Sequence, residues 1–294
     1  MLGNLFAIIA PVFICAAIGF IWEKRKLPFD LDQITPLVVN IGTPALVLST
    51  LTQAGLTMES LGVAIGYGVL LHAGTGLVGL VLLRIMKKDL PSFMPPFIFA
   101  NTGNMGLPLC LFAFGQDGLA LAIVIFAISA TGQFTIGIAF ASGTFNPRKL
   151  ATSPIIWSVV VAILIIWQEI ALPVFLSNTI NLIGDFTIPV MLISLGVSLA
   201  RLRVRQFGVS AFLAVARVMI GIVIGIAITE AFGLTGILRG VVIVQAAMPA
   251  AVTNYLLAAY YRRDAESVAG IVIVSTLVSF LILPFVLWLA IPQI

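Results

Sequence analysis

Long apolar runs alternate with short polar stretches along the whole chain. A helix needs about 20 mostly apolar residues to cross about 30 Å of hydrocarbon. Ten runs meet this requirement if some interior polar residues are tolerated, so we predict an all-α polytopic membrane protein with ten transmembrane helices. The ten runs are residues 4–22, 33–54, 60–84, 93–114, 118–141, 154–171, 174–200, 208–229, 235–260 and 267–292.

The composition agrees with a lipid environment. The 294 residues are 61% hydrophobic and 9% charged, with a mean hydropathy of +1.20, whereas soluble domains carry about 25% charged residues. The net charge of +4 does not indicate a nucleic-acid partner, because the basic residues flank apolar runs. Cys15 and Cys110 lie inside apolar runs, which favours neither a disulfide framework nor a metal site.

The loop charges predict the direction of each span. Thirteen of the 15 basic residues fall in alternate loops, and the intervening loops carry acidic residues instead. Since Lys and Arg remain on the cytoplasmic side, we expect a multi-pass protein of the cell (inner) membrane with both termini extracytoplasmic. The loop residues are Lys24, Arg25, Lys26, Arg84, Lys87, Lys88, Arg148, Lys149, Arg201, Arg203, Arg205, Arg262 and Arg263, opposite Glu59, Asp117, Glu169 and Glu230.

The midpoint of the chain divides the spans into two sets of five. We predict a first five-helix repeat over 1–142, a cytoplasmic linker over 143–153 and a second repeat over 154–294. An odd number of spans inverts the second half, which is a common construction in secondary transporters. Prolines support the repeat, because Pro44 and Pro189 are 145 residues apart and Pro108 and Pro249 are 141 apart. Each lies near the middle of a span, where proline interrupts a helix.

Two polar segments in the middle of spans four and nine predict broken helices that cross. The first runs from Phe99 to Leu109 and is rich in residues that disfavour a helix interior, and the second runs from Gln245 to Asn254 and contains Pro249. If both helices unwind there, two half-helix amino ends meet, each with free N–H groups and about half a positive charge. Such a site favours a carboxylate.

These segments supply the candidate site residues. The substrate-binding candidates are Asn101, Thr102, Gly103, Asn104, Pro108, Gln245, Met248 and Pro249. Candidates for ion coupling or gating are Gln133, Asn254, Asp185 and Arg217. Asp185 and Arg217 fall near mid-membrane, so a mutual ion pair is one option, either structural or gating. Gln133, with Thr131 and Thr135, could join Gln245 and Asn254 in a sodium site, since hard cations prefer oxygen ligands.

The same segments resemble the auxin efflux carriers, a family that includes bacterial malate and malonate permeases and the plant PIN proteins. The resemblance covers the whole chain and is most specific at Asn-Thr-Gly-Asn-x-Gly-x-Pro, residues 101–108, with support from the Pro189 and Pro249 spans. It implies a scaffold of spans 1, 2, 6 and 7, often dimeric, and a moving transport domain of spans 3–5 and 8–10. It also implies that substrate binds at Asn101, Thr102, Asn104 and the backbone around Met248.

The function predicted from these features is secondary transport of a small organic anion by alternating access, elevator-like by resemblance. The chain lacks the long central loop of the plant carriers and is closer to a bacterial permease. Alternatives are a sodium-coupled organic-anion symporter of the bile-acid-carrier type, or a ligand-sensing membrane receptor or channel. No enzyme motif stands out. We expect no cofactor, with Na⁺ or H⁺ as candidate coupling ions, and a homodimer formed through the scaffold helices.

Overall fold

The computed structural model describes residues 2–54, 57–145, 151–202 and 207–291, and all regular elements within these ranges are helical. This confirms an all-helical chain with the apolar helices of a multi-pass membrane protein. The elements are α1 (Leu2–Lys24), α2 (Leu31–Leu37), η1 (Val38–Gly42), α3 (Thr43–Gln53), α4 (Met58–Ile85), α5 (Leu90–Ile98), η2 (Thr102–Gly106), α6 (Leu107–Gly132), η3 (Gln133–Gly137), α7 (Ile138–Ser142), α9 (Pro154–Trp167), α10 (Val174–Arg201), α11 (Phe207–Ala231), α12 (Gly236–Ala246), α13 (Val252–Tyr260) and α14 (Ala265–Ala290), where η marks a π-helical segment.

Seven continuous helical stretches in the described ranges are long and apolar enough to cross a membrane. One of them, Thr102–Ser142, has 41 residues and would be about 60 Å long if straight. It turns at Gly115, whose φ of 70° and ψ of −158° are not helical, between predicted spans four and five. The predicted span 154–171 contains α9, and 235–260 contains α12 and α13, which are separate helices. The count of ten spans remains a prediction.

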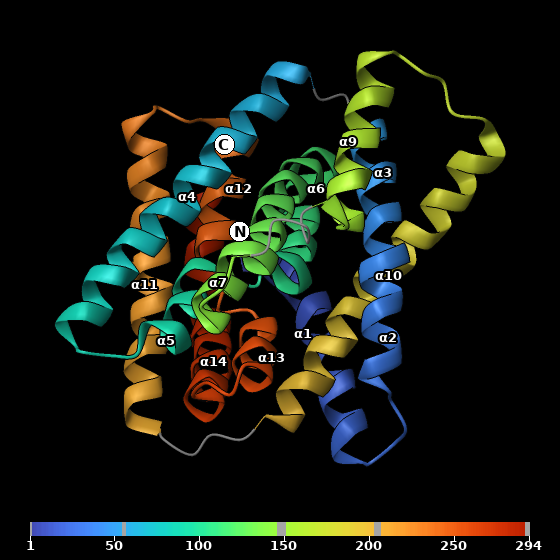
Figure 1. The fold of residues 1–294 in the computed structure, drawn as a ribbon. Coiled ribbons are helices and arrows are strands. Elements are labelled where there is room, and N and C mark those ends of the chain that lie inside the picture. The colour runs from blue at the N-terminus through green and yellow to red at the C-terminus, as the bar shows by residue number, and fades with distance from the viewer. Residues whose placement is uncertain (1, 55–56, 146–150, 203–206, 292–294) are drawn as a thin grey trace.

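Basic residues gather toward one end of the molecule. The turns α1–α2, α4–α5 and α13–α14 lie at the lower end in Figure 1, and those following α9 and α11 lie at the upper end. Lys24 and Arg201 meet at the lower end, where Lys24 Nζ donates to the Ala200 carbonyl (3.2 Å) and Arg201 pairs with Glu23 (2.9 Å). Of the predicted cytoplasmic charges, Arg148, Lys149, Arg203 and Arg205 lie outside the described residues. We call the lower end the basic end.

Helix starts near the ends of the molecule use side-chain caps. Thr57 and Ser60 form a capping box at the start of α4. Asp89 accepts from the Ser92 amide at the start of α5, and Asp264 accepts from the Ser267 amide at the start of α14. Each cap satisfies N–H groups that have no acceptor within the helix.

The helices pack in two groups. Helices α1, α3, α9 and α10 contact one another, and α4, α5, α11, α12 and α14 contact one another on the other side of α6. In Figure 1 the labels of α2, α3, α9 and α10 lie at the right and those of α4, α5 and α11 at the left. The division into scaffold and transport spans remains a prediction.

Glycines allow the closest backbone contact in the first group. A Cβ added to Gly196 would lie 1.9 Å from the Ala16 carbonyl oxygen, and one added to Gly19 would lie 2.0 Å from the Ile193 carbonyl oxygen. Helices α1 and α10 therefore touch backbone to backbone. Gly62 and Gly66 of α4 differ, since no atom outside their own helix lies within 4 Å of a Cβ added at either position.

The mid-span prolines differ in their effect. Pro249 lies in the gap between α12 and α13, and Pro108 lies in the first turn of α6, just after a π segment. Pro44 lies in the first turn of α3, after η1. Pro189, however, sits inside α10, which is assigned as helix from Val174 to Arg201. The expectation of a break in span seven is therefore wrong; the ring removes one backbone hydrogen bond without ending the helix.

Candidate functional site

The two interrupted segments cross and pair through their backbones. The amide N–H of Asn101 donates to the Pro249 carbonyl (2.7 Å), and the amide N–H of Ala251 donates to the Phe99 carbonyl (3.3 Å). Ala100 and Ala250 form an isolated antiparallel bridge between them. The prediction that both helices are broken here and that they cross is confirmed.

Local sequence explains where each helix stops. Pro249 has no N–H to continue α12, and its ring disfavours a helical conformation at the residue before it. In the other segment Phe99 is extended (φ −103°, ψ 98°) and Asn101 is also outside the helical region (ψ 54°). Asn and Gly in the 101–106 stretch disfavour a regular helix, and a π segment forms instead, closed by a bond from the Gly106 amide to the Asn101 carbonyl (3.1 Å).

Neighbouring helices satisfy the backbone groups freed by the two breaks. Ser275 of α14 accepts from the Ala250 amide (3.1 Å), and Ser279, one turn later, donates to the Ala247 carbonyl (3.3 Å). Arg217 of α11 donates from Nε to the Pro96 carbonyl (3.1 Å). Non-helical backbone at membrane depth requires such partners, so the crossing is a supported structure.

A small cavity of about 110 Å³ lies on one side of the crossing. Since a water molecule has about 30 Å³ in the liquid, this space suits a few waters or a small organic ion. Its wall combines parts of both interrupted helices with all three π segments. The lining residues are Val38, Val39, Thr43, Ala100, Asn101, Thr102, Gly103, Asn104, Phe126, Ser129, Ala130, Gln133, Phe134, Ile155, Met191, Ala251, Val252 and Thr253.

Two helix amino ends border this cavity. The segment η2 and the helix α6 that continues it begin at Thr102, and α13 begins at Val252; neither start has a side-chain cap. The first N–H groups of a helix have no acceptor within it, and the aligned peptide dipoles place partial positive charge there. In addition, Asn101 Nδ2 is buried without a hydrogen-bond partner among the described residues. The cavity wall therefore presents donors and positive potential without a cation in the lining.

A closed hydrogen-bond network supports the cavity wall. Thr253 Oγ1 donates to Gln133 Oε1 (2.9 Å), Gln133 Nε2 donates to Asn254 Oδ1 (2.9 Å), and Asn254 Nδ2 donates to the Phe99 carbonyl (2.9 Å). The network links η3 to α13 and to the break before η2. The oxygens of Gln133 and Asn254 both accept hydrogen bonds inside the protein, so neither is a free ligand for sodium in this state.

The structure gathers only part of the predicted site. Asn101, Thr102, Gly103 and Asn104 line the cavity, but the other substrate candidates do not. Gln245 is fully buried on a different face, where its amide contacts Cys110 Sγ (3.9 Å) and packs against Gly106. Pro108, Met248 and Pro249 are buried around the crossing outside the cavity lining.

The structure does not bring all the candidates for ion coupling or gating together either. Gln133 and Asn254 are joined directly, whereas the Thr135 side chain bonds to backbone, with Oγ1 donating to the Thr131 carbonyl (2.7 Å). The proposed sodium set with Gln245 is therefore not assembled. Asp185 and Arg217 form no ion pair either: Asp185 is exposed on α10, and Arg217 is 2% exposed within α11. The two helices are not packing neighbours, which explains the wrong prediction.

Several cavity residues were not among the sequence candidates. Val38, Val39 and Thr43 come from span two, and Met191 comes from span seven. The Asn40-Ile41-Gly42-Thr43-Pro44 stretch carries a signal for irregular helix, because Gly and Pro both weaken it. Nothing in the sequence indicates that this stretch meets span four.

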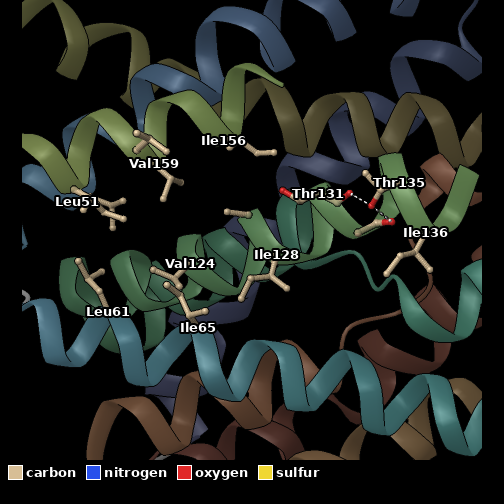
Figure 2. Close-up of a pocket in the computed structure, with 14 residues that line it drawn as sticks. Leu51, Leu61, Ile65, Val124, Ile128, Thr131, Thr135, Ile136, Ile156 and Val159 are labelled. Carbon is tan, nitrogen blue, oxygen red and sulfur yellow. Dashed lines mark hydrogen bonds between the residues drawn. The ribbon is translucent and has the colours of Figure 1, made fainter. Parts of the chain in front are cut away.

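Another cavity, about 420 Å³, lies elsewhere and is almost entirely apolar. Figure 2 shows Leu51, Ile156 and Val159 on one side of it and Leu61 and Ile65 on the other. It therefore separates α3 and α9 from α4 and α6. Two uncapped helix amino ends border the smaller polar cavity instead, which therefore remains the candidate site.

A third cavity, about 400 Å³, lies toward the basic end. Its lining includes Thr35 of α2, Ser198 and Arg201 of α10, and Tyr255 of α13. Val252 lines both this cavity and the small one at the crossing. The larger of these two cavities is bordered by α2, α10 and α13.

Apolar helices long enough to span a membrane, two of them interrupted at a buried polar cavity, define a multi-pass membrane protein built for a solute site. Residues 138–287, about half of the chain, match the family described as "Membrane transport protein". The chain belongs to this family, which is the auxin efflux carrier family that its sequence resembles. It is a membrane transporter of that family.

Two archaeal relatives are also named as transporters. The chain is 25% identical over 225 residues to an uncharacterized transporter of Methanocaldococcus jannaschii, covering 72% of each chain. It is 24% identical over 289 residues to an uncharacterized transporter of Methanothermobacter thermautotrophicus, covering 94% of this chain and 92% of the relative. Both names state transport without a substrate.

Proposed function

We propose that this chain is a secondary transporter that carries a small carboxylate through the cavity at the helix crossing. One observation carries the proposal: two uncapped helix amino ends, at Thr102 and Val252, border the same small cavity, beside the unpartnered Nδ2 of Asn101. Amide N–H groups at helix amino ends bind carboxylates and phosphates well. The volume of about 110 Å³ favours a small ion.

The inverted repeat of ten spans is part of this proposal. Besides the prolines, an offset of 145 residues relates Gly76 of α4 to Gly221 of α11. A Cβ on Gly76 would lie 3.2 Å from the Ile98 side chain, at the last residue of α5, and one on Gly221 would lie 2.0 Å from the carbonyl of Ala246, the last residue of α12. Each helix before an interrupted span thus packs against the end of its first half, as a repeat would require.

Alternating access would move α4–α7 and α11–α14 against α1–α3, α9 and α10. The apolar cavity between α3/α9 and α4/α6 supports such a boundary, because few polar contacts would have to break there. The cavity that lies toward the basic end supports a state open to the cytoplasm, if positive charge marks that side. Both termini would then be extracytoplasmic, in the cell membrane.

A homodimer formed through the scaffold helices would bury a face of α10 that is unfavourable in contact with lipid. Asp185 is exposed in the middle of α10, beside Leu182 and Phe186, which are 75% and 63% exposed. A charged side chain facing lipid at a helix centre costs about 2.5–3.5 kcal/mol on insertion scales. A second copy packed on this face of α10 would remove that contact with lipid.

The residues around this site favour transport that is coupled to H⁺ or uncoupled over transport that is coupled to Na⁺. The oxygens of Gln133 and Asn254 are engaged in the network that holds the cavity wall. Flux measured with sodium replaced by potassium, and separately with the proton gradient collapsed, distinguishes the mechanisms.

The proposal is tested by flux in proteoliposomes. A thermal-shift panel of mono- and dicarboxylates selects the labelled probe. Asn101→Ala and Asn104→Ala should lower uptake by about tenfold or more, because a hydrogen bond to a charged group contributes about 1.5–3 kcal/mol. Asn181→Ala, on α10 outside the cavity, is the matched control, since Asn181 only accepts a bond from Gln53. Unchanged uptake in both cavity variants removes this site from consideration.

A further inference from the structure

Arg217 is a buried cation that the proposed transport site does not use. It is 2% exposed in the middle of α11, and within the described chain it has no acidic partner. Its Nε donates to the Pro96 carbonyl (3.1 Å), while Nη1 is buried without a hydrogen-bond partner in the described part of the chain. A buried charge must be balanced by nearby groups of opposite polarity, so the surroundings of its guanidinium are informative.

The first such group is the carboxyl end of α5. Pro96 lies in the last turn of α5, where a continuing helix would supply the Ala100 amide as the donor to its carbonyl. The break moves Ala100 into the antiparallel bridge with Ala250. The carbonyl is therefore orphaned by the break, and Arg217 replaces the missing donor.

The second group is the carboxyl end of α12. Ala246 is its last residue, and the Ala250 amide that would bond its carbonyl in a continuing helix donates instead to Ser275 (3.1 Å). A Cβ on Gly221, one turn after Arg217, would lie 2.0 Å from the Ala246 oxygen and 2.7 Å from Arg217 Nη1. The Ala246 carbonyl, which lacks its helical donor, and the unpartnered Nη1 of Arg217 therefore both lie next to Gly221.

We propose that Arg217 is a positioning residue that clamps the carboxyl ends of both interrupted helices. Each end carries about half a negative charge, and the planar guanidinium has five donors arranged as a fork, so one side chain can serve two carbonyl ends. With these carboxyl ends held in place, the amino ends of η2 and α13 stay fixed toward the cavity. The role of Arg217 in transport rests on the proposed function. Its role in holding the two helix ends does not.

The repeat explains why a single arginine does this. The offset that relates Gly76 to Gly221 also relates His72 of α4 to Arg217. His72 Nδ1 lies 2.7 Å from the Gly68 carbonyl, one turn earlier in its own helix, and so is engaged locally. The two halves are therefore unequal at this position, and the second half supplies the group that reaches both breaks.

Hydrogen exchange measured by mass spectrometry tests the clamp without a substrate. The amides of Asn101 and Ala251 report on the crossing, because each bonds across it. Arg217→Met should raise their exchange by about tenfold or more, the effect of losing a buried cation at a helix carboxyl end, and Arg217→Lys should restore part of the protection. Arg239→Met is the control, since Arg239 lies in α12 and binds the Leu289 carbonyl (2.8 Å) and Glu230 (3.3 Å).

A thermal shift with acetate, malonate and succinate follows on the same variants. A positioning role predicts that Arg217→Met loses at least tenfold in apparent affinity for whichever anion the unaltered chain binds, with Arg217→Lys intermediate. Unchanged exchange in Arg217→Met, or an equal rise in Arg239→Met, overturns the clamp. If Arg217→Met does not fold, the exchange of the Asn101 and Ala251 amides is measured in Gly221→Ala and decides instead. This variant displaces the Ala246 carbonyl and keeps the charge of Arg217. A chain that binds none of the anions contradicts the proposed function, while exchange still decides the clamp.

Discussion

The backbone amide of Asn101 donates a 2.7 Å hydrogen bond to the carbonyl of Pro249. This bond joins the interrupted segment of span four to that of span nine and brings the start of η2 and the start of α13 to one cavity. Two helices that would be unsuitable as simple membrane spans thereby satisfy each other's backbone. The following predictions test the contacts around this crossing.

The Gln133 network should contribute strongly to stability. Gln133→Leu removes the acceptor of Thr253 and the donor to Asn254 Oδ1, and each buried polar group left unpaired costs about 1–3 kcal/mol. We expect a clear fall in the melting temperature of the detergent-solubilised protein. In the double variant Gln133→Leu/Asn254→Leu the losses should be less than additive, as for residues in one network. Additive losses would show that the two side chains act independently.

Gly106 should tolerate a side chain only if Gln245 is shortened. A Cβ at Gly106 would lie 2.4 Å from Gln245 Oε1, so Gly106→Ala should lower both stability and anion uptake through overpacking, by about 1–3 kcal/mol in stability. Gln245→Ala added to Gly106→Ala should recover much of the stability, because it removes the colliding amide. The thermal-unfolding midpoints of the two single variants and the double variant check this. Failure of the second substitution to help would contradict the packing of η2 on α12.

The contact between α1 and α10 predicts opposite effects of two glycine substitutions. Gly196→Ala forces a Cβ to within 1.9 Å of the Ala16 carbonyl and should separate the helices, with a loss of about 1–3 kcal/mol or more. Gly62→Ala on α4 is the matched control, since no other atom lies within 4 Å of its added Cβ. Alanine there should be neutral or stabilising by about 0.5–1 kcal/mol. Similar melting temperatures for the two variants would argue against the backbone contact.

The cavity between α2, α10 and α13 predicts access from the basic end. In a background with Cys15 and Cys110 replaced, Ser198→Cys should react with a membrane-impermeant thiol reagent added to the cytoplasmic side, because Ser198 lines that cavity. Reagent added only to the other side should react slowly. Inverted and right-side-out vesicles separate the two cases. Faster reaction from the extracytoplasmic side would contradict both the access route and the charge-based orientation.

The sequence reveals the breaks but not their partners. Pro249 and the Asn-Gly stretch from 101 to 106 act locally on the backbone, so the ends of α5 and α12 could be predicted. The bond between Gln133 and Asn254, and the bond from Arg217 to Pro96, join residues more than a hundred positions apart. Such contacts depend on how helices pack, which no local pattern encodes.

The same limit explains the failed interpretations. Similar predicted depths in the membrane make an ion pair between Asp185 and Arg217 one option, but depth does not say which faces of α10 and α11 the side chains occupy. Pro189 was expected to break its span by analogy with Pro249, yet α10 continues past it. Gln245 belongs to the segment that crosses, but it points to Gly106 and Cys110 rather than to the cavity. The sequence therefore predicts which segments are interrupted better than it predicts which side chains contact one another.

The central claim is that backbone and amide N–H groups at the crossing hold a negatively charged ligand. The most direct test compares each carboxylate with its uncharged amide, such as succinate with succinamide, by thermal shift on the purified protein and on Asn101→Asp. The account predicts stabilisation by a carboxylate, none by its amide, and loss of the effect in Asn101→Asp, whose own carboxylate would occupy the positive region. Equal stabilisation by the neutral amide, or carboxylate binding retained in Asn101→Asp, would contradict it.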